Sequence, residues 1–272
     1  MVFYRLTHVA LAITVAILSS ATFATADVIK VGGTGGALAY LERIAELVDD
    51  TFEIDVVDGL GSSGANRAVI AGVIDVAISG RALNDNERAA GLIARPLLTT
   101  PFAFFTSHED PVDIPSAQIW QLYQNPGSPN ALFDDEPVRV ILRPESDSDQ
   151  AFAKAHFEGF EAAYEAARSI HGVPLAQTDQ DNADLAEQLD NSLTTGTLLQ
   201  MVSEERNLRA ISIDGIAPTP ETLRSRTYPY VKTFYVVFRP DAAEDVTAFV
   251  DYLFSPAGVA NAEALGAIVV GP

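Results

Sequence analysis

A segment rich in glycine and serine, DGLGSSGANRA at 58–68, carries the first residues whose spacing suggests chemistry. From Gly59 to Gly64 it matches G-x-G-x-x-G, which in dinucleotide-binding proteins turns a strand tightly into a helix beneath a pyrophosphate. That fingerprint also needs an acidic residue about 20 positions further on, to bind the ribose. Ser79 and Gly80 stand at that distance, and neither is acidic. The dinucleotide interpretation is therefore not favoured.

The same segment suits a small anion. Backbone N–H groups at the start of a helix point outward and bind negative groups, and Ser62 and Ser63 would add hydroxyl donors. The plainer alternative is a loop that caps its own helix. Two further corners of the chain have the same character: Gly33-Thr34-Gly35, and Arg143 with Ser146 and Ser148. We expect all three corners to face one cleft.

A repeated unit of strand, loop and helix would position these corners. The units expected from the apolar periodicity are a strand at 28–31 with a helix at 37–48, a strand at 52–57 with a helix at 65–71, and a strand at 138–142 with a helix at 150–169; a further strand covers 73–79. In the first helix the apolar stripe is Leu38, Leu41, Ala45 and Val48. Alternating strands and helices predict an α/β fold with mixed, mostly parallel sheets flanked by helices. In such folds, ligands bind beyond the carboxyl ends of the strands.

Four segments in order resemble the phosphate-binding proteins of bacterial ABC transporters. They are GSSGANRAVIAGVIDVAISGR at 61–81, VILRPESDSDQAF at 140–152, AISIDGIAPTPETLRSRTYPYVKTFYVVF at 210–238 and SPAGVANAEALGAIVV at 255–270. The resemblance implies a two-lobed periplasmic-binding-protein clamshell of type II. Lobe 1 would comprise 27–104 plus 230–272 and lobe 2 would comprise 105–229, joined by hinge strands near 101–107 and 228–234.

The resemblance also implies a function. Such a protein closes on a phosphate-like oxyanion and presents it to the membrane permease of an ABC transporter, acting as a monomer, without catalysis and without a cofactor. Thr34, Ser62 and Arg143 match positions that touch the oxyanion; Arg143 would be a charged, two-pronged donor. The full predicted ligand-binding set is Thr34, Gly35, Ser62, Ser63, Arg143, Asp147, Ser148 and Asp149.

The chain departs from the resembled pattern at the third corner. Asp147-Ser148-Asp149 replaces the family's Ser-Gly-Thr, and Gly80 stands where some members place an aspartate that accepts the ligand's proton. Asp147 or Asp149 would take over that role, or Asp147 would cap its own helix with Gln150 completing a capping box. Capping is the favoured interpretation for Asp147. If it caps the helix, the ligand could be a different small solute.

Other residue patterns carry weaker predictions. Glu145, Asp147 and Asp149 alternate as in a calcium loop, but Gln150 and His156 occupy positions that need glycine and glutamate, so no metal site is expected. Arg67 and Arg81 are candidates for a second cationic donor to the ligand, although pairing with surface carboxylates is the default expectation, and Lys232 is a minor ligand candidate. His108, His156 and His171 lack paired ligand spacing, and Trp120 and Tyr123 are expected to pack.

Composition limits the classes of partner. A formal net charge of −20 excludes nucleic acids and anionic membrane surfaces as the principal partners. Residues 1–26 have the pattern of a signal peptide: Arg5 near the start, an apolar run, and Ala24-Thr25-Ala26 before a predicted cleavage after Ala26. The mature protein is therefore expected in the periplasm, where the absence of cysteine excludes disulfides.

Two functions of other classes stay open. A sensor of the same fold would dock on a membrane receptor instead of a permease. An exported hydrolase would use Ser62 or Ser63 as its nucleophile, although GLGSSGA lacks the G-x-S-x-G elbow and would still need a histidine nearby.

Overall fold

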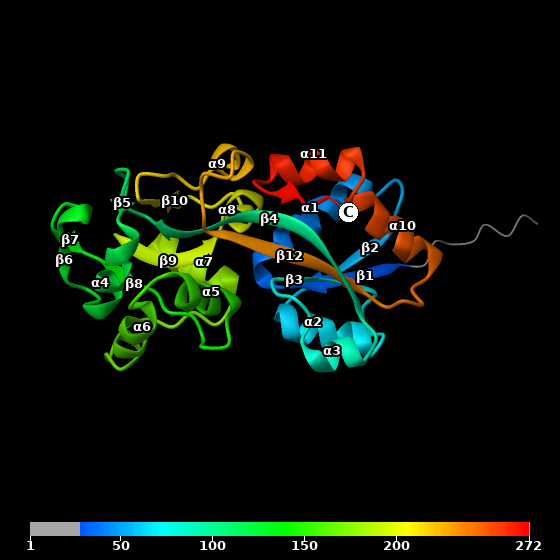
Figure 1. Ribbon diagram of the computed structural model, residues 1–272, viewed down its shortest axis with the longest axis horizontal. Coiled ribbons are helices and arrows are strands. Elements are labelled where there is room, and N and C mark those ends of the chain that lie inside the picture. Colours follow the sequence, from blue (N-terminus) through cyan, green and yellow to red (C-terminus); the bar gives the residue numbers. More distant parts are fainter. Residues whose placement is uncertain (1–27, 272) are drawn as a thin grey trace, which may run out of the picture.

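The computed structural model describes residues 28–271 and shows two halves along its longest axis (Figure 1). Two long strands, β4 (Ile93–Thr106) and β12 (Val231–Phe238), run from one half into the other. The predicted signal peptide and its cleavage site lie outside the described residues. Within 28–271, no helix has both the length and the apolar character needed to span a membrane.

A nine-stranded mixed sheet connects the two halves in the order β2-β1-β3-β12-β4-β9-β8. Its other strands are β1 (Ile29–Gly33), β2 (Ile54–Val57), β3 (Val76–Ser79), β8 (Arg139–Val140), β9 (Ser192–Thr197), β10 (Arg209–Ala210) and β13 (Ile268–Val269). The pairs β1–β2, β1–β3 and β8–β9 are parallel, whereas β12 runs antiparallel to β3 and β4. The predicted α/β fold is confirmed.

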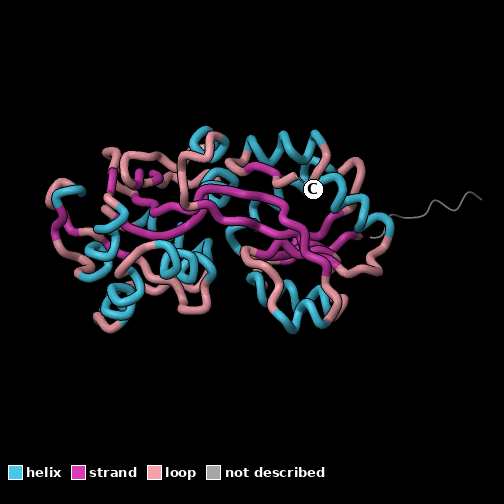
Figure 2. Tube along the Cα trace, viewed as in Figure 1, coloured by secondary structure: helices cyan, strands magenta, loops and turns pink. Residues whose placement is uncertain are grey.

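Helices lie outside the strands in both halves (Figure 2). They are α1 (Leu38–Val48), α2 (Gly61–Ile70), α3 (Asp85–Ala89), α4 (Ile119–Gln124), α5 (Ser148–His156), α6 (Phe160–Arg168), α7 (Asp179–Gln188), α8 (Leu198–Ser203), α9 (Pro220–Arg224), α10 (Glu244–Leu253) and α11 (Pro256–Ala264). Short pairs also form between β5 (Asp113–Ile114) and β11 (Ser212–Ile213), and between β6 (Pro129–Asn130) and β7 (Glu136–Pro137).

Each half has its own hydrophobic core. One core gathers residues such as Val31, Ile78 and Phe249, and the other gathers residues of the opposite half such as Tyr123 and Phe160. Strand β4 contributes Leu98 to the first core and Phe102 and Phe104 to the second, while Leu199 of α8 joins the first. The change of core therefore falls between 98 and 102 in β4, slightly before the predicted lobe boundary at 104.

The structure corrects the predicted buried face of α1 and the predicted start of α2. In α1 the buried stripe is Tyr40, Leu41, Ile44 and Val48, because the helix is rotated away from Leu38 and Ala45. Helix α2 begins at Gly61, four residues before the predicted start.

The single helix predicted at 150–169 is two helices. The first helix ends at His156, because its C-cap residue Phe157 is extended (φ −117°, ψ 114°). Gly159, with φ 78° in the left-handed region that suits glycine, is the N-cap of α6. A Cβ at Gly159 would lie 3.1 Å from the Trp120 ring, which packs closely against this turn. Trp120 and Tyr123 both pack on the second core, as predicted.

Candidate ligand-binding cleft

A cavity of about 830 Å³ lies between the two halves. It is lined by the loop after β1, the starts of α2, α5 and α7, the turn after β3, and β12. Every predicted ligand residue except Asp149 lines it: Thr34, Gly35, Ser62, Ser63, Arg143, Asp147 and Ser148. The structure thus brings the three predicted corners together, while ligand contact by these residues stays a prediction.

The start of α2 offers backbone donors to this cavity. Its N-cap residue, Leu60, has no side-chain oxygen that could cap the helix. The first N–H groups of an α-helix have no partner within the helix, so those of Gly61, Ser62 and Ser63 are left for a ligand. Gly59 and Gly61 have φ 71° and 61°, and this left-handed backbone is what the glycines supply.

Three serine hydroxyls in the cavity wall each accept a hydrogen bond from the protein. Ser62 Oγ accepts from the Gly80 N–H at 2.9 Å, and Ser63 Oγ accepts from the Arg81 guanidinium at 2.8 Å. Ser148 Oγ accepts from Lys232 Nζ at 2.8 Å. Because a hydroxyl carries one proton and two lone pairs, all three protons are free to be donated to a ligand.

Gly80 marks the place where these groups meet. A Cβ built on Gly80 would lie 3.4 Å from Ser148 Oγ, 3.5 Å from Ser62 Oγ and 3.5 Å from Lys232 Cε. Donors from both halves and from the linking strand β12 therefore surround one point. The missing side chain at Gly80 leaves that point open.

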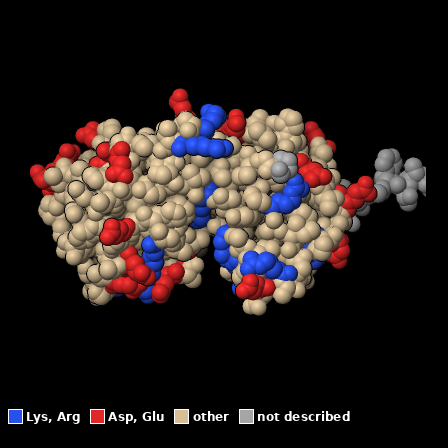
Figure 3. All heavy atoms as spheres, viewed as in Figure 1, with Lys and Arg blue, Asp and Glu red and all other residues tan. Residues whose placement is uncertain are grey.

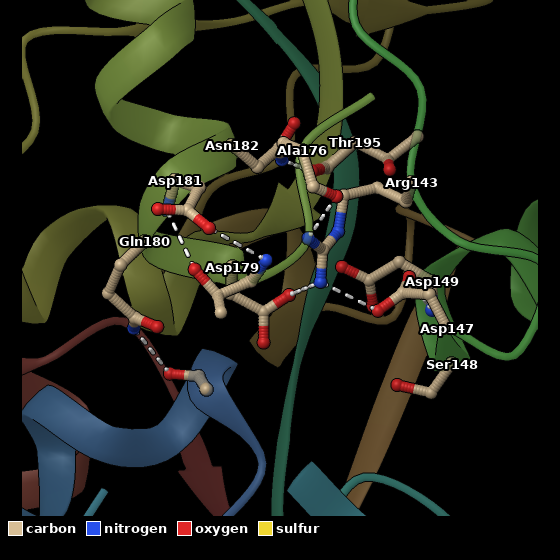
Figure 4. Close-up of polar contacts among 12 residues, drawn as sticks. Arg143, Asp147, Ser148, Asp149, Ala176, Asp179, Gln180, Asp181, Asn182 and Thr195 are labelled. Atoms are coloured by element: carbon tan, nitrogen blue, oxygen red, sulfur yellow. Dashed lines mark hydrogen bonds and ion pairs between the residues drawn. The ribbon is translucent and has the colours of Figure 1, made fainter. Parts of the chain in front are cut away.

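Arg143 is buried and held by its own neighbours. Its Nη1 donates to the Ala176 carbonyl at 2.9 Å, and its Nη2 donates to Asp147 Oδ2 at 2.9 Å and Asp179 Oδ1 at 2.8 Å (Figure 4). Burial by itself would lower the pKa of Arg143, but the carboxylates of Asp147, Asp179 and Asp149 raise it, so the guanidinium stays charged. Of its five N–H groups, the Nε proton and one Nη1 proton are left without a protein acceptor among the described residues.

Lys232, a minor candidate from the sequence, is central to the cleft. Its ammonium is buried and forms an ion pair with Asp149, in addition to its bond to Ser148. Burial would lower the pKa of Lys232, but Asp149, Asp147 and Asp179 raise it above the ordinary value. Asp149 is occupied by this pair and lies behind the cavity wall. The feature of the sequence that could have pointed to Lys232 as a cleft residue is its position as a lone lysine within the apolar run of β12.

Asp147 caps α5, as predicted. Its Oδ1 accepts from the N–H groups of Asp149 at 2.9 Å and Gln150 at 3.2 Å. The reciprocal capping-box bond predicted from Gln150 is wrong, because the buried Gln150 amide has no hydrogen-bond partner among the described residues. Glu145 pairs with Arg168, Asp147 with Arg143 and Asp149 with Lys232, so the three alternating acids point at three different cations.

Asp179 is a cleft residue that the sequence analysis did not select. It is the first residue of α7, which Thr178 and Asp181 cap reciprocally. Its side chain is 11% exposed, its Oδ1 accepts from Arg143, and its Oδ2 lies beside Gly35. Burial, followed by the charges of Asp149 and Asp147, raises the pKa of Asp179 to about 6 against the opposing effect of Arg143 and Lys232. A capping box in TDQD signals the helix start, but nothing local shows that Asp179 faces Arg143.

The remaining arginines of the cleft differ in their contacts. Arg81 donates to both carboxylate oxygens of Glu87, so it pairs with a carboxylate as predicted, but with a buried one rather than one at the surface. This contact lowers the pKa of Glu87 to about 2. Arg67 lines the cavity, and no ion pair of its side chain is present in the described region. Lys and Arg atoms show in the notch between the halves, and more of them lie elsewhere on this face among scattered Asp and Glu atoms (Figure 3).

The histidines take no part in the serine contacts. His156 lines the cavity and stacks on Phe152, with 3.9 Å between ring centroids. Across residues 28–271 no histidine is hydrogen-bonded to Ser62 or Ser63, whose hydroxyls accept from Gly80 and Arg81 instead. His108 lies near the exposed carboxylates of Asp110 and Asp134, a grouping that sequence spacing did not show.

The two-lobed fold and its central cleft are those of a periplasmic binding protein. Residues 19–257 match the model of the PBP superfamily domain, and the chain belongs to that family. A comparison with curated protein sequences gave no significant match.

Solved structures share the fold over nearly the whole chain. A Clostridium perfringens protein described as a phosphate ABC transporter substrate-binding protein, solved with bound phosphate, superposes with a TM-score of 0.75 at 19% identity, covering 90% of this chain and 100% of that one. An ABC-type phosphate transport receptor from Vibrio cholerae gives 0.61 at 17% identity and 89% and 100% coverage. A high-affinity periplasmic phosphate-binding protein, PfluDING, solved with phosphate, gives 0.66 at 14% identity, with 89% and 90% coverage.

Proposed function

We propose that this protein binds a small tetrahedral oxyanion, phosphate foremost, in the cleft and delivers it to the permease of an ABC transporter. The observation that carries the proposal is the convergence of the Ser62 and Ser148 hydroxyls around Gly80, with the Ser63 hydroxyl in the same cavity wall and no protein acceptor for any of the three protons among residues 28–271. The phosphate-binding proteins of the same fold support the choice of ligand.

The donors suit an anion although the whole chain carries a charge of −20. Serine hydroxyls and the N-terminus of α2 bind through directed dipoles, which act at short range and do not depend on the net charge. Lys232 and Arg143 are buried, where water screens their charge little, but both are already paired with carboxylates, so the directed donors rather than net charge must hold the anion. Binding by local donors therefore outweighs the unfavourable long-range field.

The wider setting of the proposal follows from the resemblance. The signal peptide, residues 1–26, would be removed after Ala26, and the mature monomer would work in the periplasm without enzymatic activity. Its lobes, 27–104 plus 230–272 and 105–229, would close on the anion about β4 and β12. The predicted ligand residues keep their roles, except that Asp147 would act by capping α5 and holding Arg143, and Asp149 by holding Lys232.

Calorimetric titration of the protein starting at Asp27 with phosphate tests the proposal. Micromolar affinity is expected for the wild type. The double variant Ser62→Ala/Ser148→Ala, which removes two converging donors, should bind at least about 100-fold more weakly, since each bond to a charged group contributes roughly 1.5–3 kcal/mol. Ser169→Ala, whose hydroxyl is exposed on α6's end and bonds only to the Ala166 carbonyl, is the matched control and should match the wild type.

Arg143→Ala provides a second test of the same assignment. Its affinity for phosphate should fall, because the variant loses a buried cation beside the anion. Wild-type affinity in Arg143→Ala and in the serine double variant would show that phosphate does not bind at this cleft. No phosphate binding by the folded wild type would overturn the proposed ligand.

A further inference from the structure

Outside the cleft, one histidine lies beside two carboxylates. His108 and Asp110 are in the loop after β4, and Asp134 ends the 3-10 helix at Ala131–Phe133. Their ligating atoms all lie within 4.8 Å of one another. The strands that flank this 3-10 helix, β6 and β7, lie at the end of the molecule furthest from the other half (Figure 1). The group is therefore separate from the cleft, whose lining includes none of the three residues.

The His108 ring is held in place with one nitrogen left over. Its Nδ1 lies 2.8 Å from Asn191 Oδ1 and donates its proton to that oxygen. The ring also packs against Phe133, with 5.4 Å between centroids. Because Nδ1 carries the proton of the neutral ring, Nε2 presents a lone pair. The side chain is only 10% exposed, and Nε2 has no hydrogen-bond partner within residues 28–271.

The distance from Nε2 to the carboxylates suits a shared cation better than a direct ion pair. Asp134 Oδ2 is 3.7 Å from Nε2, whereas a charged N–H···O bond measures about 2.7–2.9 Å. Two ligands of a tetrahedral zinc ion, each about 2.0–2.1 Å from the metal, lie about 3.4 Å apart. Both carboxylates are exposed, so small side-chain rotations bring all three ligands to that spacing.

The charge of the surroundings also favours a cation. The two segments read His108-Glu109-Asp110 and Asp134-Asp135-Glu136, so every residue in them except the histidine is acidic. Among residues 28–271 none of these acids forms an ion pair with a lysine or arginine. The net charge of −20, which opposes an anion in the cleft, attracts a cation to this end of the protein.

We propose that His108, Asp110 and Asp134 bind a divalent transition-metal ion, Zn²⁺ in particular. Zn²⁺ takes imidazole nitrogen and carboxylate oxygen together, and three protein ligands leave a fourth position for water. Asn191 is the positioning residue, because its oxygen fixes the proton on Nδ1 and so turns the lone pair of Nε2 toward the ion. The bound ion fastens the loop after β4 to the turn at 131–135 and stabilises this half of the protein.

The first test is calorimetric titration with Zn²⁺ of the untagged protein starting at Asp27, in a phosphate-free buffer at pH 7.5. One ion per chain should bind with micromolar affinity. Ca²⁺ should bind at least about 100-fold more weakly, because it takes oxygen ligands and gains little from the imidazole.

His108→Asn removes Nε2 but keeps an N–H donor for Asn191. It should weaken Zn²⁺ binding at least about 100-fold, since loss of a ligand costs more than loss of a residue that orients one. Asp135→Asn is the matched control: it removes a charge next to Asp134, at a residue with the same left-handed backbone, and should bind Zn²⁺ as the wild type does.

Two variants of Asn191 separate positioning from a structural role. Asn191 has φ 49°, which glycine adopts freely, so Asn191→Gly removes the amide oxygen without straining the backbone. Its affinity for Zn²⁺ should fall about 10- to 100-fold. Asn191→Asp keeps an oxygen that accepts from Nδ1 and should restore the wild-type affinity. Wild-type affinity in Asn191→Gly would remove Asn191 from the proposed site.

The outcomes separate this inference from the proposed function. A wild type that binds Zn²⁺ no more tightly than Ca²⁺ overturns the metal site. So does a His108→Asn variant with wild-type affinity, which would show that scattered surface carboxylates hold the ion. Phosphate affinity should be the same in His108→Asn and the wild type, because His108 lies outside the cleft, so failure of the metal site leaves the proposed function standing.

Hydrogen exchange of the wild type covers the case in which the variants do not fold. Saturating Zn²⁺ should slow the exchange of backbone amides at 107–110 and 131–135, because the ion ties these two segments together. Protection confined to other segments, such as those around His156 and His171, would overturn the assignment.

Discussion

Lys232 and Asp149 lie 83 positions apart in the sequence and form a buried ion pair at the wall of the cleft. Their side chains are 6% and 8% exposed. Because Lys232 is on β12 and Asp149 is on α5, the pair fastens the first turn of a helix in one half to a strand that runs through both halves. The same ammonium holds the Ser148 hydroxyl toward Gly80.

Breaking this pair from one side should destabilise the fold strongly. Lys232→Met leaves the Asp149 carboxylate buried without its cation, and we expect a loss of about 3–5 kcal/mol in the free energy of unfolding. Lys232→Met/Asp149→Asn removes both charges and should recover most of that loss. Urea denaturation at pH 7.5 measures the two values. Equal stability of the single and double variants would show that the Asp149 carboxylate, left without Lys232, does not destabilise the fold.

A methyl group at Gly35 should weaken ligand binding without unfolding the protein. The added Cβ would lie 2.5 Å from Asp179 Oδ2 and 2.9 Å from Gln180 Oε1, so these two side chains or the walls that carry them must shift. We expect Gly35→Ala to bind phosphate at least about tenfold more weakly, roughly 1.4 kcal/mol. Gly36→Ala is the matched control, because its nearest neighbour atom would be 3.8 Å away. Equal affinities of the two variants would contradict the close approach of the walls.

The cap of α5 can be separated from the charge of Asp147. Asp147→Asn keeps an oxygen that can accept from the N–H groups of Asp149 and Gln150, whereas Asp147→Ala removes it. Both variants lose the charge beside Arg143. We therefore expect Asp147→Ala to be less stable than Asp147→Asn by about 1 kcal/mol in thermal or urea unfolding. Equal unfolding free energies of the two variants would show that the side-chain cap of Asp147 does not stabilise α5.

The contact between Glu87 and Arg81 should stabilise the protein except at acidic pH. Hydrogen bonds from Arg81 lower the pKa of Glu87 from 4.5 to about 2, so the folded state binds the proton less tightly than the unfolded state. Its contribution is present above pH 4.5 and is lost as the pH falls toward 2. We expect Glu87→Gln to cost about 1–2 kcal/mol at pH 7, because solvent screens the partly exposed Arg81.

The pH profile of unfolding tests this assignment. The difference in stability between wild type and Glu87→Gln should shrink between pH 5 and pH 2. Glu244→Gln, at an exposed acid in the first turn of α10 with no arginine partner in the described region, should show no such change. A difference that is constant with pH would show that Glu87 does not titrate as described.

Much of the architecture follows from local sequence. The β-branched runs around Val31, Val76 and Val236 predict buried strands, and the corners after them contain the glycines and serines that a turn into a helix needs. These patterns depend on a few neighbouring residues, so they can be recognised in the sequence without knowledge of the fold. One error concerned a break between helices: α5 ends at His156 and α6 begins after Gly159, a turn against which Trp120 packs, whereas the periodicity alone predicted one helix through this point.

The sequence by itself determined the α/β organisation, the linking strands β4 and β12, and the three corners at Thr34, Ser62 and Arg143. Only the tertiary structure decided how the charges of the cleft are matched. It assigned Asp147 and Asp179 to Arg143, Asp149 to Lys232, and left one oxygen of Asp179 free. The physical reason is that an ion pair depends on distance and burial in space, and residues 36 or 83 positions apart carry no local signal of being neighbours.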